Sequence, residues 1–334
     1  MLTNCFLKAK SNPMNLYDIP PRQTQSYLTE LLKSRNIWPK NKMGQNFLID
    51  LNLMDLVVNS ANLQPSDAVL EVGSGTGSLS NRLVEGAGFV LSVELDPAFQ
   101  KLTEETVIER DRFFLHRGDI LKNKNQIQPQ VTEKLAEITS MPGISGYKLV
   151  ANLPYAVATP VMSNLLISRN PPTKIVAMVQ LEIAEKIISK PQSKDFGALP
   201  ILFQSLAKVE IVRRISPAAF WPRPKVESAI IKIDPSPLLR SKLVFEGVKP
   251  EDGPLCFRNF LRGLFVHRRK NLRGALLSMP NNKLSKVEID AKLVILDIKG
   301  EIRAETLSPL DHFRLCSQFG GGVFVSGETD ETAD

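Results

Sequence analysis

The chain has 334 residues, of which 43% are hydrophobic and 23% charged, a composition typical of a globular protein with one large and one smaller domain. No apolar run approaches the roughly 20 residues that span a bilayer, and the three cysteines lie far apart, so the sequence predicts no membrane span, no disulfide framework, no metal site and a reducing, cytoplasmic compartment. The net charge is +7, and because the last 14 residues carry four acids and no base, the rest holds +11, which favours a polyanionic partner such as nucleic acid.

Residues 1–38 are predicted to form an N-terminal extension with one helix, over residues 22–35, that ends before Pro39. A polar segment follows, Gly44-Gln45-Asn46-Phe47-Leu48, and then a helix from residue 50 to about residue 61. Taken alone, this segment is equally typical of a buried lead-in to that helix.

A glycine-rich loop comes next. A buried strand, residues 68–72, runs into Gly73-Ser74-Gly75-Thr76-Gly77, and the following strand, residues 89–93, ends at Glu94. Glycines permit a tight turn whose N–H groups approach a ligand, and an acid about 20 residues further on holds a ribose in nucleoside-binding α/β folds. Because Ser78 stands where a dinucleotide fingerprint has its third glycine, the pattern favours a nucleoside cofactor other than NAD.

A third strand, residues 113–116, precedes Asp119, whose carboxylate could meet an adenine edge or cap a helix. The polar connection 122–146 is predicted to contain a helix near residues 131–138. A buried strand at residues 148–151 then ends in Asn152-Leu153-Pro154-Tyr155, and Thr159-Pro160 indicates that a helix starts there and runs to residue 168. The tetrapeptide brings together an amide, a rigid backbone and an aromatic ring, which suits a flat base bearing an amine; a plain strand-to-helix turn is the alternative.

Further elements are a strand at residues 175–179, a helix at 181–189, a mobile loop at 192–197, a short helix and two strands at 209–212 and 229–233. Five strands that alternate with helices in this way indicate a parallel, doubly wound sheet. Ligands of such sheets lie beyond the carboxyl ends of the strands, where Gly73, Glu94, Asp119 and Asn152 all fall.

The last third of the chain is rich in cations. Residues 220–228 present Phe220, Arg223 and Lys225 in a proline-stiffened loop, which is typical of base stacking and phosphate contact, or of a loop that packs its aromatic rings inward. Prolines at residues 235 and 237 mark a domain boundary. Residues 254–277 have helical spacing, with arginines within about 60° of each other on one side, which predicts an RNA-binding face or, alternatively, a solvated one. These arginines are Arg258, Arg262, Arg269 and Arg273.

Taken together, the motifs resemble the ribosomal RNA adenine N6,N6-dimethyltransferase family of the small-subunit methyltransferase A type. The resemblance extends from about residue 22 to residue 319, while the connection 122–146 is longer than usual and the tail after residue 319 has no family counterpart. Seven segments carry it in the family's order: Gly44-Gln45-Asn46-Phe47-Leu48, Glu71-Val72-Gly73-Ser74-Gly75-Thr76-Gly77, Glu94-Leu95-Asp96, Gly118-Asp119, Asn152-Leu153-Pro154-Tyr155, Phe220-x-Pro222-x-Pro224-Lys225-Val226-x-Ser228-Ala229 and His267-Arg268-Arg269-Lys270-Asn271-Leu272.

The resemblance implies a class I methyltransferase domain of Rossmann-like α/β fold, with a doubly wound, mostly parallel, seven-stranded sheet, at residues 39–235. It also implies a small all-α RNA-binding domain at 236–319 and an acidic, disordered tail at 320–334. It implies dimethylation, with S-adenosylmethionine, of the N6 amines of two adjacent adenines near the 3′ end of small-subunit rRNA during ribosome biogenesis. The partner is then the immature small subunit, and a monomer is expected. The expected cofactor-binding residues are Gln45, Asn46, Leu48, Gly73, Gly75, Glu94, Leu95, Asp119 and Asn152. The expected RNA-binding residues are Arg223, Lys225, Arg258, Arg262, Arg268, Arg269, Lys270 and Arg273.

The expected catalytic residues are Asn152, Pro154, Tyr155 and Phe220. The side chain of Asn152 and the carbonyl of Pro154 would accept hydrogen bonds from the adenine amine, and the two rings would hold the extruded base between them. Alternatives are a large-subunit rRNA adenine methyltransferase of the antibiotic-resistance type, a DNA adenine methyltransferase, and an assembly or transcription factor that keeps the fold with little catalysis. The segment 220–229 and the Arg268-Arg269-Lys270 run favour the small-subunit type, and the intact glycine-rich loop favours retained activity.

Overall fold

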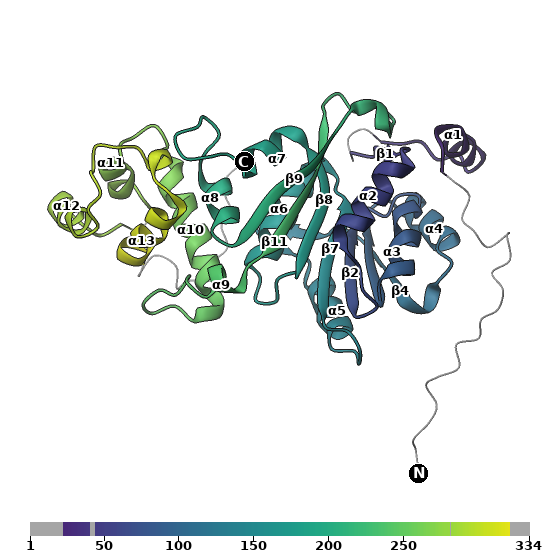
Figure 1. Ribbon diagram of the computed structural model, residues 1–334, viewed down its shortest axis with the longest axis horizontal. Helices are drawn as coiled ribbons and strands as arrows, with labels where there is room; N and C mark the ends of the chain where they lie inside the picture. The colour runs from purple at the N-terminus through teal and green to yellow at the C-terminus, as the bar shows by residue number, and fades with distance from the viewer. Residues whose placement is uncertain (1–22, 41–43, 281, 321–334) are drawn as a thin grey trace, which may run out of the picture.

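A seven-stranded β-sheet runs through the larger part of the molecule, in the order β4-β3-β2-β7-β8-β11-β9 (Figure 1). The computed structural model describes residues 23–40, 44–280 and 282–320. All neighbouring strands of the sheet pair in parallel except β11, which is antiparallel to both β8 and β9. The predicted doubly wound, mostly parallel sheet is therefore confirmed. Its strands are β2 (Asp67–Val72), β3 (Phe89–Glu94), β4 (Phe113–Arg117), β7 (Gly146–Asn152), β8 (Lys174–Gln180), β9 (Ala207–Ile215) and β11 (Ser228–Pro235).

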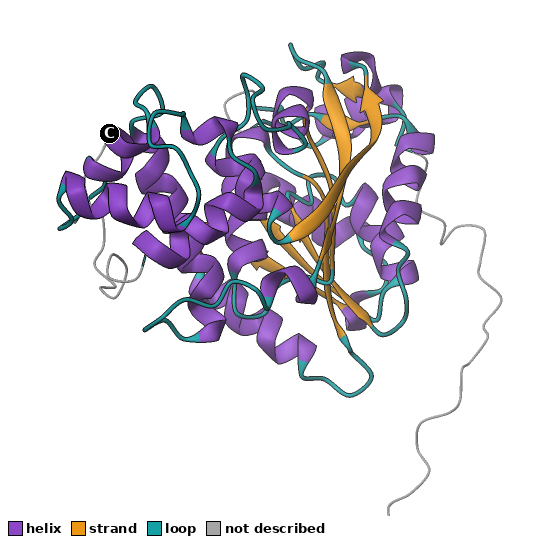
Figure 2. Ribbon diagram, turned by 60° about the vertical axis from the view of Figure 1, so that its left-hand side comes forward, coloured by secondary structure: helices purple, strands orange, loops and turns teal. Residues whose placement is uncertain are grey.

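Helices cover both faces of the sheet, as Figure 2 shows. Successive side chains of a strand point to opposite faces, so in β2 Leu70 packs into one hydrophobic cluster and Val69 into the other. The cluster of Val69 contains residues of α2 (Leu51–Ala61) and α3 (Ser78–Gly86), and the cluster of Leu70 contains residues of α5 (Pro129–Thr139) and α6 (Tyr155–Ile167). Central strands that are buried on both faces explain the unbroken apolar runs in the sequence.

The other described elements complete the fold. Two small antiparallel pairs are formed by β1 (Phe47–Leu48) with β10 (Phe220–Trp221) and by β5 (Leu121–Asn123) with β6 (Gln126–Ile127). The other helices are α1 (Gln25–Ser34), α4 (Pro97–Thr106), α7 (Leu181–Ile187), α8 (Ala198–Gln204), α9 (Pro237–Arg240), α10 (Gly253–Val266), α11 (Leu272–Leu277), α12 (Lys286–Ile295) and α13 (Pro309–Phe319). Short 3-10 turns lie at Arg110–Arg112, Pro217–Ala219, Pro250–Asp252 and Ala304–Thr306.

Helix α6 begins at Tyr155, so the prediction of a start at Thr159 was wrong. The carbonyl oxygen of Pro154 accepts hydrogen bonds from the backbone N–H groups of Val157 and Ala158, at 3.0 and 3.1 Å, and these bonds form the first turn. Pro160 consequently lies inside the helix, where its ring removes one backbone donor. The motif at the end of β7 thus passes directly into a helix.

The C-terminal helices pack together beyond the β9 edge of the sheet (Figure 1). Their buried side chains, such as Phe257 of α10 and Leu315 of α13, join the same hydrophobic cluster as Phe203 of α8 and Leu70 of the central strand β2. A C-terminal helical region is therefore present, while the division of the chain at residue 235 stays a prediction because one core continues across it. The predicted segments 1–22 and 321–334 lie outside the described residues.

The single helix predicted over residues 254–277 is two helices. Helix α10 ends at Val266, and α11 begins at Leu272 after Asn271, whose side-chain oxygen accepts a hydrogen bond from the N–H of Gly274 at 2.9 Å. An N-cap of this kind starts a new helix because it satisfies a backbone donor that has no partner within the helix. The four arginines therefore do not share one helical face, and that prediction was wrong. In the part of the chain that the structure describes, no helix is long and apolar enough to cross a membrane.

Candidate active site

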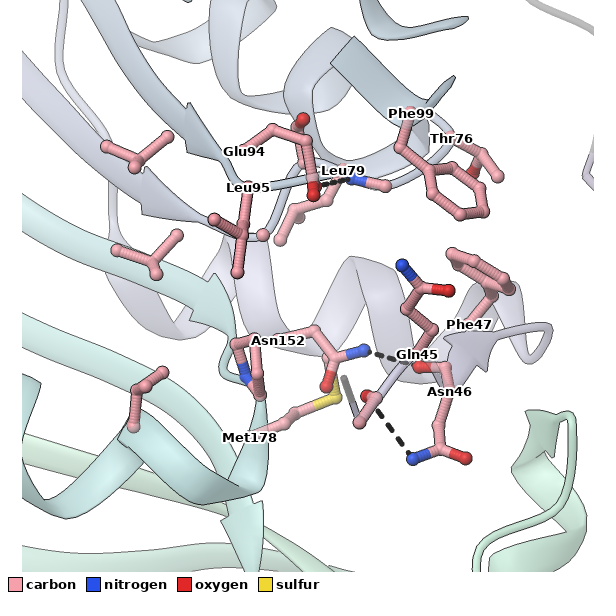
Figure 3. Close-up of a pocket in the computed structure, with 18 of the residues that line it drawn as sticks. Gln45, Asn46, Phe47, Thr76, Leu79, Glu94, Leu95, Phe99, Asn152 and Met178 are labelled. Atoms are coloured by element: carbon pink, nitrogen blue, oxygen red, sulfur yellow. Dashed lines mark hydrogen bonds between the residues drawn. The ribbon is translucent and has the colours of Figure 1, made fainter. Parts of the chain in front are cut away.

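A cavity of about 240 Å³ lies at the carboxyl ends of β2, β3, β4 and β7 (Figure 3). The nine residues predicted to bind the cofactor all line it, although they come from four strand ends and from the segment before α2. These residues are Gln45, Asn46, Leu48, Gly73, Gly75, Glu94, Leu95, Asp119 and Asn152. The topology explains their meeting, because the carboxyl ends of parallel strands lie along one edge of the sheet.

The glycine-rich loop needs its glycines for backbone conformation. Gly73, Gly75 and Gly77 have φ angles of +82°, +55° and +75°, in the left-handed region that other residues rarely adopt. A Cβ atom on Gly75 would in addition lie 2.9 Å from the ring of Phe47, which packs over the loop. The loop and the segment that contains Phe47 therefore form one wall of the cavity.

Glu94 is fixed by backbone donors. Its Oε2 accepts a hydrogen bond from the N–H of Gly75 and its Oε1 one from the N–H of Asp96, both at 2.9 Å. Each carboxylate oxygen has a second lone pair, so both retain an acceptor site for a pair of hydroxyl groups. Only 7% of Glu94 is exposed, and this burial raises the pKa of its carboxyl group.

Asn152 is oriented by a contact with the opposite wall. Its Nδ2 donates to the carbonyl oxygen of Asn46 at 2.9 Å, as the dashed line in Figure 3 shows. A carbonyl can only accept, so the amide nitrogen must face Asn46 and the amide oxygen is left as an acceptor. No described residue donates to that oxygen. The side chain therefore offers the cavity an acceptor suited to an amine.

Asp96 links the segment before β1 to the strand end that carries Glu94. Its Oδ2 accepts from Lys40 Nζ at 2.9 Å and from Gln45 Nε2 at 3.0 Å, and its Oδ1 from the N–H of Ala98 at 3.0 Å. Burial raises the pKa of Asp96, but the hydrogen bonds from Lys40 and Gln45 outweigh it and the pKa is lowered. The sequence placed Asp96 only within a motif and did not predict this role.

The predicted catalytic residues are not all at the cavity. Pro154 lines it, close to Gly73, whereas Tyr155 and Phe220 do not. The hydroxyl groups of Tyr155 and of the buried Ser228 form a hydrogen bond of 2.7 Å. Phe220 is 3% exposed and pairs with Leu48 between β10 and β1. The structure thus places Phe220 in the core, and the prediction that it stacks on a base stays a prediction.

The carbonyl of Pro154 is also engaged. It accepts the two N–H groups that begin α6, so it is not a free second acceptor as predicted. The carbonyl of Leu153 lies one residue earlier, and no described N–H group donates to it. Loss of the predicted acceptor follows from the helix start at Tyr155, which the sequence did not reveal.

Three of the eight predicted RNA-binding residues are free on the surface. Arg223, Lys225 and Arg269 are exposed and form no hydrogen bond or ion pair with any described residue. Lys270 is exposed but donates to Ser278 Oγ at 2.7 Å. The four remaining arginines direct donors into the fold.

Two of these arginines form ion pairs. Arg273 pairs with Asp290 and, at 3.2 Å, with Glu301. Arg268 pairs with Glu305 at 3.3 Å and donates to the carbonyl oxygen of Phe196 at 3.1 Å. The loop 192–197, which was predicted to be mobile, is thus held by Arg268 and by the fully buried ring of Phe196.

The other two arginines bind amide groups. Arg258, only 7% exposed, donates to Asn164 Oδ1 at 2.8 Å, and Arg262 donates to Asn125 Oδ1 at 2.5 Å. Arg258 is therefore not on an RNA-facing surface, and its assignment was wrong. The sequence could not reveal this because both partners lie about 100 residues or more away along the chain.

Glu71 is a buried acid next to the glycine-rich loop, and in the sequence it stands out only as part of the motif Glu71-Val72-Gly73-Ser74-Gly75-Thr76-Gly77. Its Oε2 accepts from Ser80 Oγ at 2.6 Å and from Ser92 Oγ at 2.8 Å, while Oε1 is buried without a partner. Burial raises the pKa of Glu71 to about 7. An acid inside an otherwise apolar strand is the signal that could have identified it. No cluster of three or more His, Cys, Asp or Glu residues that could hold a metal ion occurs among the described residues.

The chain is similar to known proteins over most of its length. The family described as "Ribosomal RNA adenine dimethylase" matches residues 38–310. "Ribosomal RNA small subunit methyltransferase A" of Clostridium acetobutylicum is 35% identical over 280 residues, which cover 84% of this chain and 93% of that protein. The protein of the same name from Picosynechococcus sp. is 33% identical over 282 residues, which cover 83% and 96%.

Two solved structures share the fold. A dimethyladenosine transferase from Plasmodium falciparum has a TM-score of 0.61 at 23% identity, over 81% of this chain and 96% of the other. The 23S rRNA methyltransferase ErmE has a TM-score of 0.55 at 23% identity, over 82% and 99%. At this identity both comparisons establish the fold alone.

Proposed function

The chain belongs to the ribosomal RNA adenine dimethylase family and is an S-adenosylmethionine-dependent rRNA adenine dimethyltransferase, and we propose that its substrate is two adjacent adenines near the 3′ end of small-subunit rRNA. The small-subunit assignment is supported by relatives named for that subunit, which are 33 to 35% identical over most of both chains. The chemistry is supported by one observation above all: Asn152 donates its amide N–H to Asn46 and so keeps its oxygen for an amine at the cavity.

The residues of the cavity fit S-adenosylmethionine. Glu94 keeps acceptor sites for the two ribose hydroxyls, and Asp119, whose Oδ1 accepts from the N–H of Leu121 at 2.9 Å, keeps its other oxygen for the adenine amine. Leu95 and Ile120 offer apolar sides to a flat ring. When bound there, the cofactor supplies a methyl group on a positively charged sulfur.

Asn152 then acts on the target amine. The lone pair of an adenine amine is conjugated with the ring, which makes the nitrogen a poor nucleophile. A hydrogen bond from one of its N–H groups to Asn152 Oδ1 favours a pyramidal nitrogen with a localised lone pair. Most of the rate enhancement comes from alignment, since orientation supplies roughly 7–11 kcal/mol in well-placed reactions. No strong base is needed because the proton becomes acidic once the nitrogen is alkylated.

The assignment of regions follows from this chemistry. We propose that residues 39–235 carry catalysis and that residues 236–319 help to bind RNA. Arg223 and Lys225 of the first region and Arg269 of the second would contact phosphate groups, because these side chains are exposed and bond to no described residue. We also propose that the protein is a monomer in a reducing, cytoplasmic compartment.

The experiment that tests this function uses the whole protein, labelled S-adenosylmethionine and immature small subunits, followed by mapping of the methylated nucleotides. We expect two methyl groups on each of two adjacent adenines near the 3′ end of the small-subunit rRNA. Mature small subunits and large-subunit rRNA are the controls. Methylation of large-subunit rRNA, or of isolated single adenines, would contradict the proposal.

A further inference from the structure

Two arginines of α10 connect the C-terminal helices to two segments that follow active-site residues. These segments are the β5–β6 hairpin, which follows Asp119, and α6, which follows Asn152. Arg258 donates to Oδ1 of Asn164 in α6 at 2.8 Å, and Asn164 in turn donates its Nδ2 to the carbonyl oxygen of Lys124 at 3.2 Å. One turn further along α10, Arg262 donates to Asn125 Oδ1 at 2.5 Å. Lys124 and Asn125 form the turn between β5 and β6. Helix α10 therefore holds the tip of this hairpin and the C-terminal half of α6 together.

The near ends of the same two segments carry the active site. The hairpin begins two residues after Asp119, and the N–H of its first residue, Leu121, donates to Asp119 Oδ1 at 2.9 Å. A second bond, from the N–H of Gln128 to the carbonyl of Ile120 at 2.9 Å, closes the base of the hairpin. Helix α6 starts at Tyr155, directly after the turn that carries Asn152. Asp119 and Asn152 both line the cavity, so a shift of one segment against the other changes the spacing of its polar groups.

The chemistry of these contacts favours a positioning role over a purely stabilising one. Arg258 is 7% exposed and Asn164 is 6% exposed, whereas Arg262 and Asn125 are exposed; no described carboxylate pairs with either arginine. A buried charge that meets only neutral amides gains little net stability, because desolvation offsets the hydrogen bonds. Such bonds do fix geometry, since the planar guanidinium donates in set directions.

We propose that Arg258 and Arg262 are positioning residues, which hold the hairpin against α6 and thereby set Asp119 relative to Asn152 across the cavity. This inference rests on the proposed function, because it assigns these two side chains to the same reaction. It also makes the C-terminal helices part of the apparatus that binds the cofactor rather than only a surface for RNA.

The test begins at Asn125, which is exposed, so its variants are expected to fold. Asn125→Ala removes the acceptor of Arg262, and Asn125→Asp keeps one. We expect Asn125→Ala to raise the KM for S-adenosylmethionine and its Kd by about tenfold, the usual value of a hydrogen bond to a charged group, and Asn125→Asp to remain within about twofold of the wild type. The control is Gln130→Ala, an exposed polar residue of the same connection, which should leave both constants unchanged.

A second measurement separates positioning from contact with RNA. Arg262→Ala should raise the same KM by about as much as Asn125→Ala, and the double variant should be no worse than either, since the two changes remove one interaction. The dependence of RNA affinity on salt should not change. The inference is overturned if Asn125→Ala has the wild-type KM and Kd, or if Arg262→Ala lowers the salt slope without changing the KM.

Arg258→Lys extends the test to the buried contact, because lysine keeps the charge but loses the planar fork. We expect a raised KM for S-adenosylmethionine with an unchanged kcat at saturation; if this variant does not fold, the Asn125 series carries the conclusion alone. Failure of the proposed function would look different. In that case the wild type itself would not methylate small-subunit rRNA, whereas the effect of Asn125 on cofactor Kd is measured without any RNA.

Discussion

The polar groups at the carboxyl edge of the sheet and the cations of the C-terminal helical region use their hydrogen bonds in opposite ways. At the sheet edge, Glu94 and Asn152 each bind backbone groups with part of the side chain and keep acceptor sites for the cavity. In the helical region, Arg258, Arg268 and Arg273 direct their donors to partners within the fold. A polar residue therefore binds a ligand only with the donors and acceptors that the fold leaves unused.

The largest expected effect comes from removing an unused acceptor. Asn152→Ala should lower kcat by about 10²–10³-fold, the usual loss for one group that stabilises a transition state, while the Kd for S-adenosylmethionine rises only a few fold. Single-turnover methyl transfer and calorimetry measure the two quantities. Asn152→Asp keeps an oxygen acceptor but loses the donor to the Asn46 carbonyl, so it tests the orienting hydrogen bond as well. If kcat is unchanged in the alanine variant, Asn152 does not act on the substrate. The polar groups of the sheet edge would then serve only the fold, as the paired arginines of the helical region do.

Glu71 tests whether a buried acid next to the cavity serves stability. The pKa of Glu71 is raised to about 7 in the folded protein, above the unfolded value of about 4.5. The folded state therefore binds a proton at Glu71 more tightly than the unfolded state does. This stabilises the fold fully below pH 4.5, and the stabilisation is lost as the pH rises through 7. Glu71→Gln cannot ionise and should remove this dependence, which amounts to up to about 3 kcal/mol.

The measurement is Tm at pH 5 and at pH 8 for both proteins. We expect the Tm of the variant relative to the wild type to be higher at pH 8 than at pH 5. Parallel pH profiles would show that the pKa of Glu71 is not raised in the folded protein.

Arg269 and Arg273 allow a test within the helical region, because one is free and the other is paired. Arg269 is exposed without a partner, so Arg269→Ala should lower the slope of log affinity for RNA against log salt by about 1. Arg273 pairs with Asp290 and Glu301, so Arg273→Ala should leave that slope unchanged and lower Tm instead. Filter binding over a range of salt concentrations measures the slope, and thermal unfolding measures Tm. Equal slopes for both variants would mean that internal bonding does not predict which cation meets RNA.

The smallest expected effect concerns the ring of Tyr155. Its hydroxyl is bonded to Ser228, and loss of one such hydrogen bond is worth about 1 kcal/mol. Ser228→Ala should therefore raise the KM for RNA by about fivefold, with little change in cofactor Kd. Tyr155→Phe removes the same bond and keeps the ring, so it should behave alike. A change in cofactor Kd alone would show that Ser228 supports the sheet rather than the ring.

Much of the cavity could be predicted from the sequence because its signals are local. Gly73 and Gly75 mark a turn by residue type, and Glu94 follows a strand by position. The parts of the site that could not be predicted depend on contacts between distant segments. Phe220 is buried because β10 pairs with β1, more than 170 residues earlier in the chain, and the carbonyl of Pro154 is occupied because α6 starts earlier than Pro160 suggested.

The alternation of strands and helices can be read from the amino-acid sequence, because hydrophobic periodicity and turn residues act over a few positions. The sheet edge at which Glu94, Asp119 and Asn152 meet follows from that alternation. Which polar groups remain free depends instead on the three-dimensional packing. Arg258 and Arg269 look alike in the sequence, yet one is buried against Asn164 and the other is exposed. The reason is that a hydrogen bond consumes a donor wherever the partner comes from, and the partner is chosen by packing in three dimensions.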